Sequence, residues 1–556
     1  MKETNKDKIE FCLLTFVVIY VLGMMVFRIH LYADINDEIV NLAIAYRMAM
    51  GQTPIVDMWE AFQCSGVYLS VFLRVFLAFT SNTEGVVLFS RYVYLANLIL
   101  LALIAYDVIA FIDKKVAILM SAIILCFNLY SLYYLWYDSE SVIFMSMALL
   151  LILKYWLAGK SYNLYIAGLL MGLMALSYPQ LLVIAIAIVI YSSILLEKKN
   201  GTNIFQEGKW QIFGGFSVFI LVMAYIGIKS RFAGFLTGLE EMLFSRTGGD
   251  GKKIQVMDIF HSFYNINKVG VVLSIVVIFL YLYCRKHRKA VPYLCYSVIV
   301  VSMINQVMLK ENYRNLQNIF TFLGLYAPII CSLLDNEQMR KGLSILWGSS
   351  YLSIFIIAFS SVSLDDGPIK SWQAFLPAAI AMFISIAILL NHEFTSKEVF
   401  RRINEILMIG IIVLLINSNY TNYYSNLDLE DNVCEMKTGI YKGVYVSKEM
   451  QVWEDIEKYI KQKNGVEETV MVGVRLTPIY LMPQNRAVSP TVTTINMDRI
   501  ERYIQLKEEY PSNLFIEPFE LKDDRFKNFV DNNYVFEDEQ SFGQFSILHY
   551  KYSREG

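Results

Sequence analysis

Long apolar runs separated by short polar gaps fill about the first three quarters of the chain. A helix needs about 20 apolar residues to cross a bilayer, and the runs predict thirteen such spans. They cover residues 11–29, 85–111, 116–136, 139–157, 163–177, 179–196, 210–229, 269–284, 291–309, 317–334, 343–362, 373–391 and 401–417. The pattern therefore predicts an all-α polytopic membrane protein.

Lysine and arginine side chains gather in alternate gaps between these spans. Lys114 with Lys115, and Arg340 with Lys341, are two examples. Short loops that carry positive charge stay in the cytoplasm. The charge pattern therefore predicts a cytoplasmic N-terminus and places residues 418–556 outside the cell.

Residues 64–80 are the main ambiguity in this topology. They are apolar, but they are short and carry Arg74 near their middle. A crossing here would move every later loop to the other side and invert the charge pattern. We therefore predict a helix that lies on, or dips into, the outer interface. Residues 30–84 then form one long external loop, and residues 230–268 form another.

The last part of the chain has a different pattern, in which helical and strand periods alternate. The sequence predicts helices at 447–463, with Ser447 as a cap, and at 497–509 and 523–533, and strands at 468–475, 513–517 and a pair within 534–550. Such alternation is typical of a small α/β domain. The chain thus divides into a transmembrane domain, 1–417, and an extracytoplasmic domain, 418–556.

Composition agrees with this division and excludes some functions. The chain is 56% hydrophobic and 18% charged, with a mean hydropathy of +0.45, whereas soluble proteins are roughly one quarter charged. No basic arm with interleaved aromatic residues is present, so nucleic acid is not indicated as a partner. No Cys-x-x-Cys or His/Cys spacing suggests a metal site.

Three carboxylates open the first external loop: Asp34, Asp37 and Glu38. Asn36 or Asp34 can cap a helix that starts at Asp37, and Gly51 can end that helix. Carboxylates at a bilayer surface are costly to desolvate, so they tend to mark function. The alternative is that these acids only complement the helix dipole.

The second external gap is short and also acidic, with Asp138 and Glu140 on the same predicted side as Asp37. Two acidic openings on one side are compatible with a shared cavity. The alternative is that Asp138 or Ser139 simply caps the next helix.

Two basic residues, Lys310 and Arg314, lie on the predicted outer side, against the cytoplasmic bias of the other cations. An arginine offers a fork of donors that suits a phosphate. The alternative is that both side chains snorkel to lipid headgroups.

The first loop resembles the corresponding pattern of the GT-C glycosyltransferases, in particular the bacterial branch of the protein O-mannosyltransferase and aminoarabinose-transferase superfamily. The residues that carry the resemblance are Asp37, Glu38, Tyr46, Gly51, Pro54, Asp57 and Trp59. The YDSE stretch at 137–140 and the NYRN stretch at 312–315 resemble two further segments of that family. The resemblance covers roughly residues 10–417 and implies a transferase that uses a polyprenyl-phosphate sugar at the outer face of a bacterial plasma membrane.

The resemblance, together with the charges, assigns roles to the acidic and basic residues. We expect Asp37 to act as the general base, with Glu38 or Asp138 orienting the acceptor or holding a cation. The expected substrate-binding residues are Asp34, Asp57, Glu140, Lys310 and Arg314. The last two would stabilise the leaving phosphate. Direct displacement would invert the anomeric centre. The sequence identifies no metal ligands, and whether the reaction uses a divalent cation is left open.

The implied partners are a polyprenyl-phosphate-linked sugar, an acceptor in the cell envelope (a glycan, a lipid or a protein) and membrane lipids. Two other interpretations stay open. One is a transporter or flippase for a lipid-linked or envelope substrate, since Arg91 and Asp107 are charged residues within predicted spans. The other is a noncatalytic scaffold whose C-terminal domain binds a wall polymer.

Overall fold

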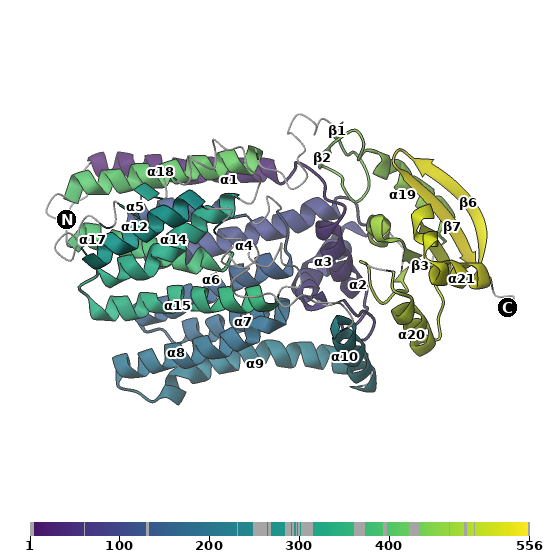
Figure 1. Ribbon diagram of the computed structural model, residues 1–556, viewed down its shortest axis with the longest axis horizontal. Helices are drawn as coiled ribbons and strands as arrows, with labels where there is room; N and C mark the ends of the chain where they lie inside the picture. Colours follow the sequence, from purple (N-terminus) through teal and green to yellow (C-terminus); the bar gives the residue numbers. More distant parts are fainter. Residues whose placement is uncertain are drawn as a thin grey trace.

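Long helices run side by side along the longest axis of the molecule, and a small mixed domain lies at one end of them, as Figure 1 shows. The computed structural model describes residues 5–60, 62–128, 133–230, 232–247, 264, 268–283, 291, 294–295, 297–298, 301, 315–360, 373–392, 397–421, 434–465, 468–482, 486–493 and 495–553.

The helical part follows the order of the predicted apolar runs. Its first helices are α1 (Asn5–Arg28), α2 (Asp37–Ala49), α3 (Gly66–Thr80), α4 (Val86–Ile109), α5 (Lys114–Leu125), α6 (Tyr137–Ala158) and α7 (Tyr162–Ser177). The later helices are α8 (Leu182–Asn200), α9 (Ile204–Lys229), α10 (Phe232–Thr247), α12 (Lys268–Tyr283), α14 (Asn315–Ser332), α15 (Glu337–Ser360), α17 (Leu376–His392) and α18 (Lys397–Thr421).

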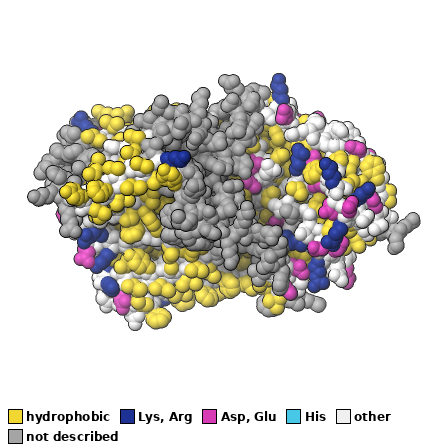
Figure 2. All heavy atoms as spheres, in the orientation of Figure 1, with side chains coloured by type: hydrophobic (Ala, Val, Ile, Leu, Met, Phe, Trp, Pro, Cys, Tyr) yellow, Lys and Arg dark blue, Asp and Glu magenta, His cyan; other side chains and the backbone are white. Residues whose placement is uncertain are grey.

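Six helical segments, among the residues that the structure describes, are long and apolar enough to cross a membrane. They are Ile9–Arg28, Gln63–Thr80, Val86–Ile109, Tyr137–Ala158, Pro179–Asn200 and Ile204–Lys229. Apolar side chains cover much of the visible helical surface, whereas charged side chains gather on the C-terminal domain and at the opposite tip (Figure 2). The predicted fold class, a polytopic helical protein with a small C-terminal α/β domain, is confirmed. The number of thirteen spans stays a prediction, and most of 291–309 lies outside the described residues.

Helix α3 is the segment whose topology the sequence leaves ambiguous. Its length and composition would allow a crossing. In Figure 1, α2 and α3 lie at the end of the long helices, next to the C-terminal domain, and run across the direction of the long helices. Val71, Val75 and Phe79 recur every four residues on one face of α3 and are exposed. An apolar stripe on such a transverse helix is what an interfacial position requires, so that position remains our prediction for α3.

The predicted helix at 116–136 is wrong at 126–128 and 133–136, the described residues that follow the end of α5 at Leu125. Backbone that leaves a helix inside a membrane protein must find other hydrogen-bond partners. Here side chains from three distant segments supply them. Asn419 Nδ2 donates to the carbonyl of Cys126 at 3.2 Å, Tyr94 donates to the carbonyl of Phe127 at 3.2 Å, and Asn41 donates to that of Leu135. Hydropathy reported the burial of this segment correctly but not its conformation.

The C-terminal domain contains a five-stranded sheet in the order β4-β3-β5-β7-β6. The strands are β3 (Thr469–Val472), β4 (Arg486–Ala487), β5 (Asn513–Ile516), β6 (Tyr534–Phe542) and β7 (Phe545–Tyr552), and the helices are α19 (Val452–Lys463), α20 (Met497–Lys507) and α21 (Asp524–Asn533). β3 is parallel to β4 and β5, and β7 is antiparallel to β5 and β6. The predicted order of elements is confirmed. The predicted cap is wrong, because α19 begins at Val452, with Gln451 rather than Ser447 as its N-cap.

A hairpin that the sequence did not predict, β1 (Cys434–Glu435) with β2 (Tyr445–Val446), joins the two parts of the molecule. Tyr445 exchanges backbone hydrogen bonds with the first loop: its amide donates to His30 at 2.6 Å and its carbonyl accepts from Tyr32 at 2.8 Å. The amides of Gly85 and Val87 donate to the carbonyls of residues 439 and 440 at 2.9 and 3.2 Å. The hairpin is therefore fixed to the helical part beside the start of α2.

Candidate active site

Asp34 fixes the start of α2, the helix that the three carboxylates were predicted to open. Its two carboxylate oxygens accept from the amides of Asn36 and Glu38, both at 3.0 Å. Of the two predicted caps, Asp34 therefore makes the hydrogen bonds, while the side chain of Asn36 makes none as a cap. The helix begins at Asp37 as predicted. Burial raises the pKa of Asp34, although these amide contacts act in the opposite direction.

Glu38 forms a buried ion pair with Arg91 on α4. Arg91 donates through Nε and Nη2 to the two carboxylate oxygens, each at 2.6 Å, and the side chains are only 1% and 4% exposed. Arg91 Nη1 also donates to the carbonyls of Ile29 and Leu31, at 2.8 and 3.2 Å. This bidentate pair holds the first turn of α2 against α4 and the end of α1. The sequence pointed to Arg91 as an unusual charge within a span, but not to its partner.

Asp37 differs from its two acidic neighbours because its side chain is only partly buried, while Asp34 and Glu38 are each 1% exposed. A carboxylate at this position is held by a rigid helix turn and still reaches the surface of the site. That combination is what a group that contacts a substrate needs.

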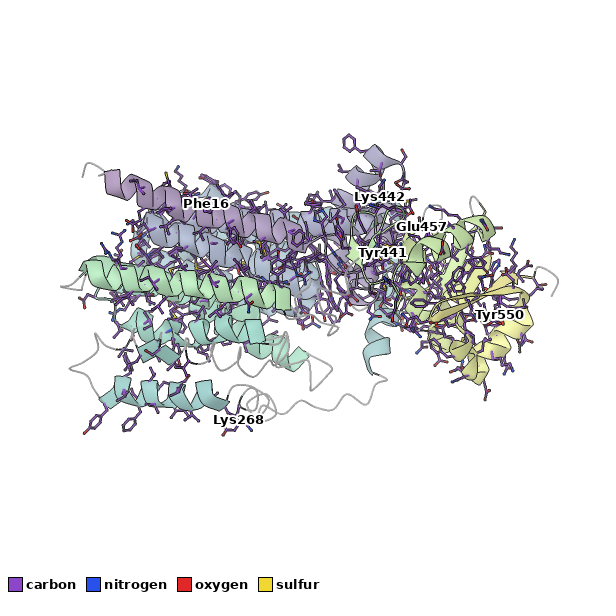
Figure 3. All side chains as sticks on the ribbon, turned by 90° about the horizontal axis from the view of Figure 1, so that it is seen from above. Phe16, Lys268, Tyr441, Lys442, Glu457 and Tyr550 are labelled. Carbon is purple, nitrogen blue, oxygen red and sulfur yellow. The ribbon has the colours of Figure 1, made fainter. Side chains whose placement is uncertain are left out.

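Tyr441, on the loop between β1 and β2, lies beside this acidic cluster, a position that the sequence did not indicate. The charges of Glu38, Asp34 and Arg91 all act on its hydroxyl, and burial raises its pKa. The side chain is 1% exposed, and its hydroxyl has no hydrogen-bond partner among the residues that the structure describes. Figure 3 places Tyr441 where the helical part meets the C-terminal domain. A residue of the tail thus forms one wall of the acidic cluster.

The second acidic segment is tied to α2 through Asn41. Its amide donates to the carbonyl of Leu135, three residues before Asp138, and its oxygen accepts from Ser65 Oγ at 3.0 Å. Asn41 lies one helical turn after Asp37. The structure therefore brings the two predicted acidic openings to neighbouring positions, which the sequence could not show.

Within the second segment, the prediction that Asp138 or Ser139 is the N-cap is wrong, because α6 begins at Tyr137 with Trp136 as its N-cap and Ser139 lies inside the first turn. The Ser139 hydroxyl accepts from the Trp136 amide at 2.8 Å, and Asp138 is 4% exposed. Glu140 is fully buried and accepts from Ser177 Oγ at 2.7 Å. Its second oxygen, Oε1, has no partner within the described part of the chain.

The structure places Asp57 at the other end of α2, away from Asp37. Asp57 Oδ2 accepts from the amide of Thr53 at 2.6 Å, and Oδ1 pairs with Lys507 Nζ at 2.5 Å. Asp57 lines a pocket of about 230 Å³ whose walls come from residues 46–57 and 486–509. We call it the junction pocket, because it lies between the first loop and the C-terminal domain.

The C-terminal domain holds the first loop around this pocket through several hydrogen bonds. The Glu60 carboxylate accepts from the amides of Val492 and Thr493, at 2.6 and 3.2 Å. The amide of Trp59 donates to the carbonyl of Pro490 at 2.7 Å, and Arg499 donates to the carbonyl of Trp59 at 2.8 Å. No local sequence pattern could indicate these contacts, since their partners are more than 400 positions apart.

Two of the predicted site residues, Lys310 and Arg314, lie outside the described residues. No group of three or more His, Cys, Asp or Glu side chains that could hold a metal ion occurs in the part of the chain that the structure covers. This finding leaves metal dependence as open as the sequence left it.

Comparisons with known proteins find a distant likeness of fold among solved structures. No protein-family model matches the chain, and no curated protein matches it. Among solved structures, the crystal structure of the Archaeoglobus fulgidus oligosaccharyltransferase in the apo form matches 97% of this chain and 74% of that chain, with a TM-score of 0.47 and 12% sequence identity. A likeness at this level carries no functional assignment to this chain.

Proposed function

We propose that the protein is a GT-C-type glycosyltransferase that moves a sugar from a polyprenyl-phosphate donor to an acceptor at the outer membrane face. The observation that carries the proposal is the contrast at the start of α2. Asp37 is partly exposed on a turn whose other two carboxylates are buried. The first-loop resemblance supports the same reaction class.

The proposed chemistry is a direct displacement at the anomeric carbon. The acceptor hydroxyl attacks that carbon and forms a new C–O bond, while the bond from the carbon to the phosphate oxygen breaks. The Asp37 carboxylate takes the hydroxyl proton as general base, and the lipid phosphate leaves with the bonding electron pair. Attack opposite the leaving group inverts the anomeric centre.

The other acidic residues of the site receive different roles. Glu38 and Arg91 neutralise each other, so in our proposal Glu38 positions Asp37 rather than contacting substrate. Asp34 fixes the same turn. Asp138, held near α2 by Asn41, orients the acceptor. Arg314 and Lys310 remain our proposal for the groups that bind the leaving phosphate.

The experiment that tests the reaction class is transfer from a panel of radiolabelled donors to membrane fractions. The panel contains polyprenyl-phosphate sugars and the matching nucleotide sugars. We expect transfer from one lipid-phosphate sugar and none directly from a nucleotide sugar in sealed vesicles that present the outer face. Transfer that depends on the nucleotide sugar alone, with polyprenyl phosphate absent, would exclude the proposed donor class.

One observation favours a second candidate, a transporter for a lipid-linked or envelope substrate. Glu140 is a buried carboxyl group with one unpartnered oxygen, within the described residues, at the start of a predicted span. Buried carboxyl groups of this kind are frequent in transport pathways. The other charges within spans have partners, since Arg91 pairs with Glu38 and Asp107 pairs with Lys154. Substrate movement in proteoliposomes without sugar transfer, lost in Glu140→Gln, would favour the transporter.

A further inference from the structure

The junction pocket contains a buried arginine without a contacting carboxylate. Arg47 is 2% exposed and belongs to the last turn of α2. Its Nε donates to Gln52 Oε1 at 2.6 Å, and its Nη2 donates to the carbonyls of Asp57 and Ser489, at 2.9 and 2.8 Å. All these acceptors are neutral, and Nη1 has no partner among the described residues.

Two further cations line the same pocket at its more exposed side. Arg486 pairs with Glu509 and is 55% exposed, and Lys507 pairs with Asp57 and is 26% exposed. Three cations therefore line the pocket with two carboxylates. Because Arg47 is the buried member and its acceptors are all neutral, its charge favours an anionic group in the deep part of the pocket.

The remaining walls are suited to a sugar ring. Tyr46 and Tyr503 supply aromatic surface, while Gln52 supplies a donor and Asp57 and Glu509 supply acceptors for hydroxyl groups. At roughly 30 Å³ per water molecule, a volume of about 230 Å³ corresponds to seven or eight waters. That space accommodates one sugar ring.

We propose that the junction pocket binds one anionic sugar unit of the acceptor, with its acidic group facing Arg47 and its hydroxyl groups facing Gln52, Asp57 and Glu509. This inference rests on the proposed function, because it names the class of acceptor. Arg47 lies ten residues after Asp37 on α2, a separation of about 15 Å along the helix axis at ~1.5 Å per residue. The recognised unit is therefore not the one that reacts near Asp37, and the acceptor is an extended, negatively charged glycan.

The test is isothermal titration calorimetry on the full chain in detergent, with glucuronic acid, glucose 1-phosphate, glucose and inorganic phosphate as probes. We expect at least one anionic sugar to bind tenfold or more tightly than both glucose and inorganic phosphate. Preference for glucuronic acid identifies a carboxylate, and preference for glucose 1-phosphate identifies a phosphate. Equal binding of glucose, no binding of any probe, or phosphate binding as tight as that of the sugar phosphate would overturn the proposal.

Variants locate the binding within the molecule. Arg47→Gln is expected to abolish binding of the preferred sugar, and Arg486→Gln, at an exposed position, to weaken it at least threefold. If Arg47→Gln does not fold, the loss of sugar affinity in Arg486→Gln and Lys507→Met tests the location of the site. The matched control is Arg502→Gln, which lies on α20 like Lys507, is 48% exposed and pairs with Glu241 outside the pocket at 3.2 Å. Equal weakening by the control would overturn the proposal.

The binding measurement uses no donor, so it separates this inference from the proposed function. Sugar transfer that requires Asp37, in a protein that binds no anionic sugar, would overturn the junction pocket alone. Tight binding that requires Arg47, in a protein that transfers nothing, would overturn the glycosyltransferase alone.

Discussion

A buried arginine lies at each end of α2, and the two arginines differ in the charge of the groups that they contact. Near the first turn, Arg91 meets Glu38 in a bidentate ion pair, with both contacts at 2.6 Å. In the last turn, Arg47 meets only the neutral oxygens of Gln52, Asp57 and Ser489. A buried charge needs compensation. Glu38 compensates the charge of Arg91, which indicates a structural role for that pair. The charge of Arg47 meets only neutral oxygens, which leaves it able to attract an anionic ligand.

The largest expected loss of stability comes from breaking the Glu38–Arg91 ion pair at the first turn of α2. Glu38→Gln leaves the Arg91 charge buried without its partner, and loss of one partner of a buried pair costs about 3–5 kcal/mol of stability. Replacing both residues, in Glu38→Leu with Arg91→Met, is expected to cost less than Glu38→Gln alone. Denaturant unfolding in mixed micelles measures the three free energies. A loss below about 1 kcal/mol for Glu38→Gln would contradict the structural role.

Substitution of Arg47, in the last turn of α2, is expected to cause a smaller loss of stability. Arg47→Gln removes three hydrogen bonds to neutral acceptors, but it also removes a buried charge that no carboxylate contacts, and the second effect offsets part of the first. The same unfolding measurement applies, now with and without the preferred anionic sugar at a saturating concentration. We expect the sugar to stabilise the wild type and to leave Arg47→Gln unchanged. A sugar-induced stabilisation that survives in Arg47→Gln would contradict the proposal that Arg47 binds the anionic sugar.

The smallest expected effect is a dependence of stability on pH in the C-terminal domain. His549 on β7 is 1% exposed, with Nε2 2.9 Å from the Asn513 side-chain oxygen, and burial lowers its pKa from the usual 6.5. A lowered pKa means that folding favours neutral histidine. The contribution of His549 is therefore present above pH 6.5 and is lost as pH falls through the folded-state value, by at most about 1.4 kcal/mol per pH unit.

Hydrogen exchange of β5 and β7 at pH 7.5 and pH 5 measures this effect. After correction for the intrinsic slowing of amide exchange at lower pH, we expect lower protection factors in these strands at pH 5, with little change in the first turn of α2. His549→Gln should remove most of the difference between the two pH values. Protection factors that are the same at the two pH values in the wild type would contradict the assigned role of His549.

Periodicity predicted the elements well wherever a segment's neighbours in sequence decide its structure. The start of α2 at Asp37, and strand β5 at Asn513–Ile516 within the predicted 513–517, are examples. The helix predicted at 116–136 failed because distant side chains replace its helical hydrogen bonds after Leu125. A hydropathy pattern cannot distinguish a buried helix from buried irregular backbone that is satisfied in this way.

The candidate site was predictable in part for the same physical reason. Local sequence indicated the acids Asp34, Asp37 and Glu38, because they cluster at a helix start. Their different environments depend on Arg91 and Tyr441, which come from other parts of the chain. The junction pocket was invisible to sequence reasoning, since its two walls are more than 400 positions apart.

The central claim is that Asp37 acts as the base while its buried neighbours hold it in place. The most direct measurement is the rate of sugar transfer from the identified donor by wild type and Asp37→Asn, with the exposed-surface variant Asp455→Asn as control. We predict a loss of at least about a hundredfold in Asp37→Asn, with the unfolding free energy preserved and the control unaffected. Transfer that survives in a folded Asp37→Asn protein would contradict the account and reduce Asp37 to a dipole-complementing residue.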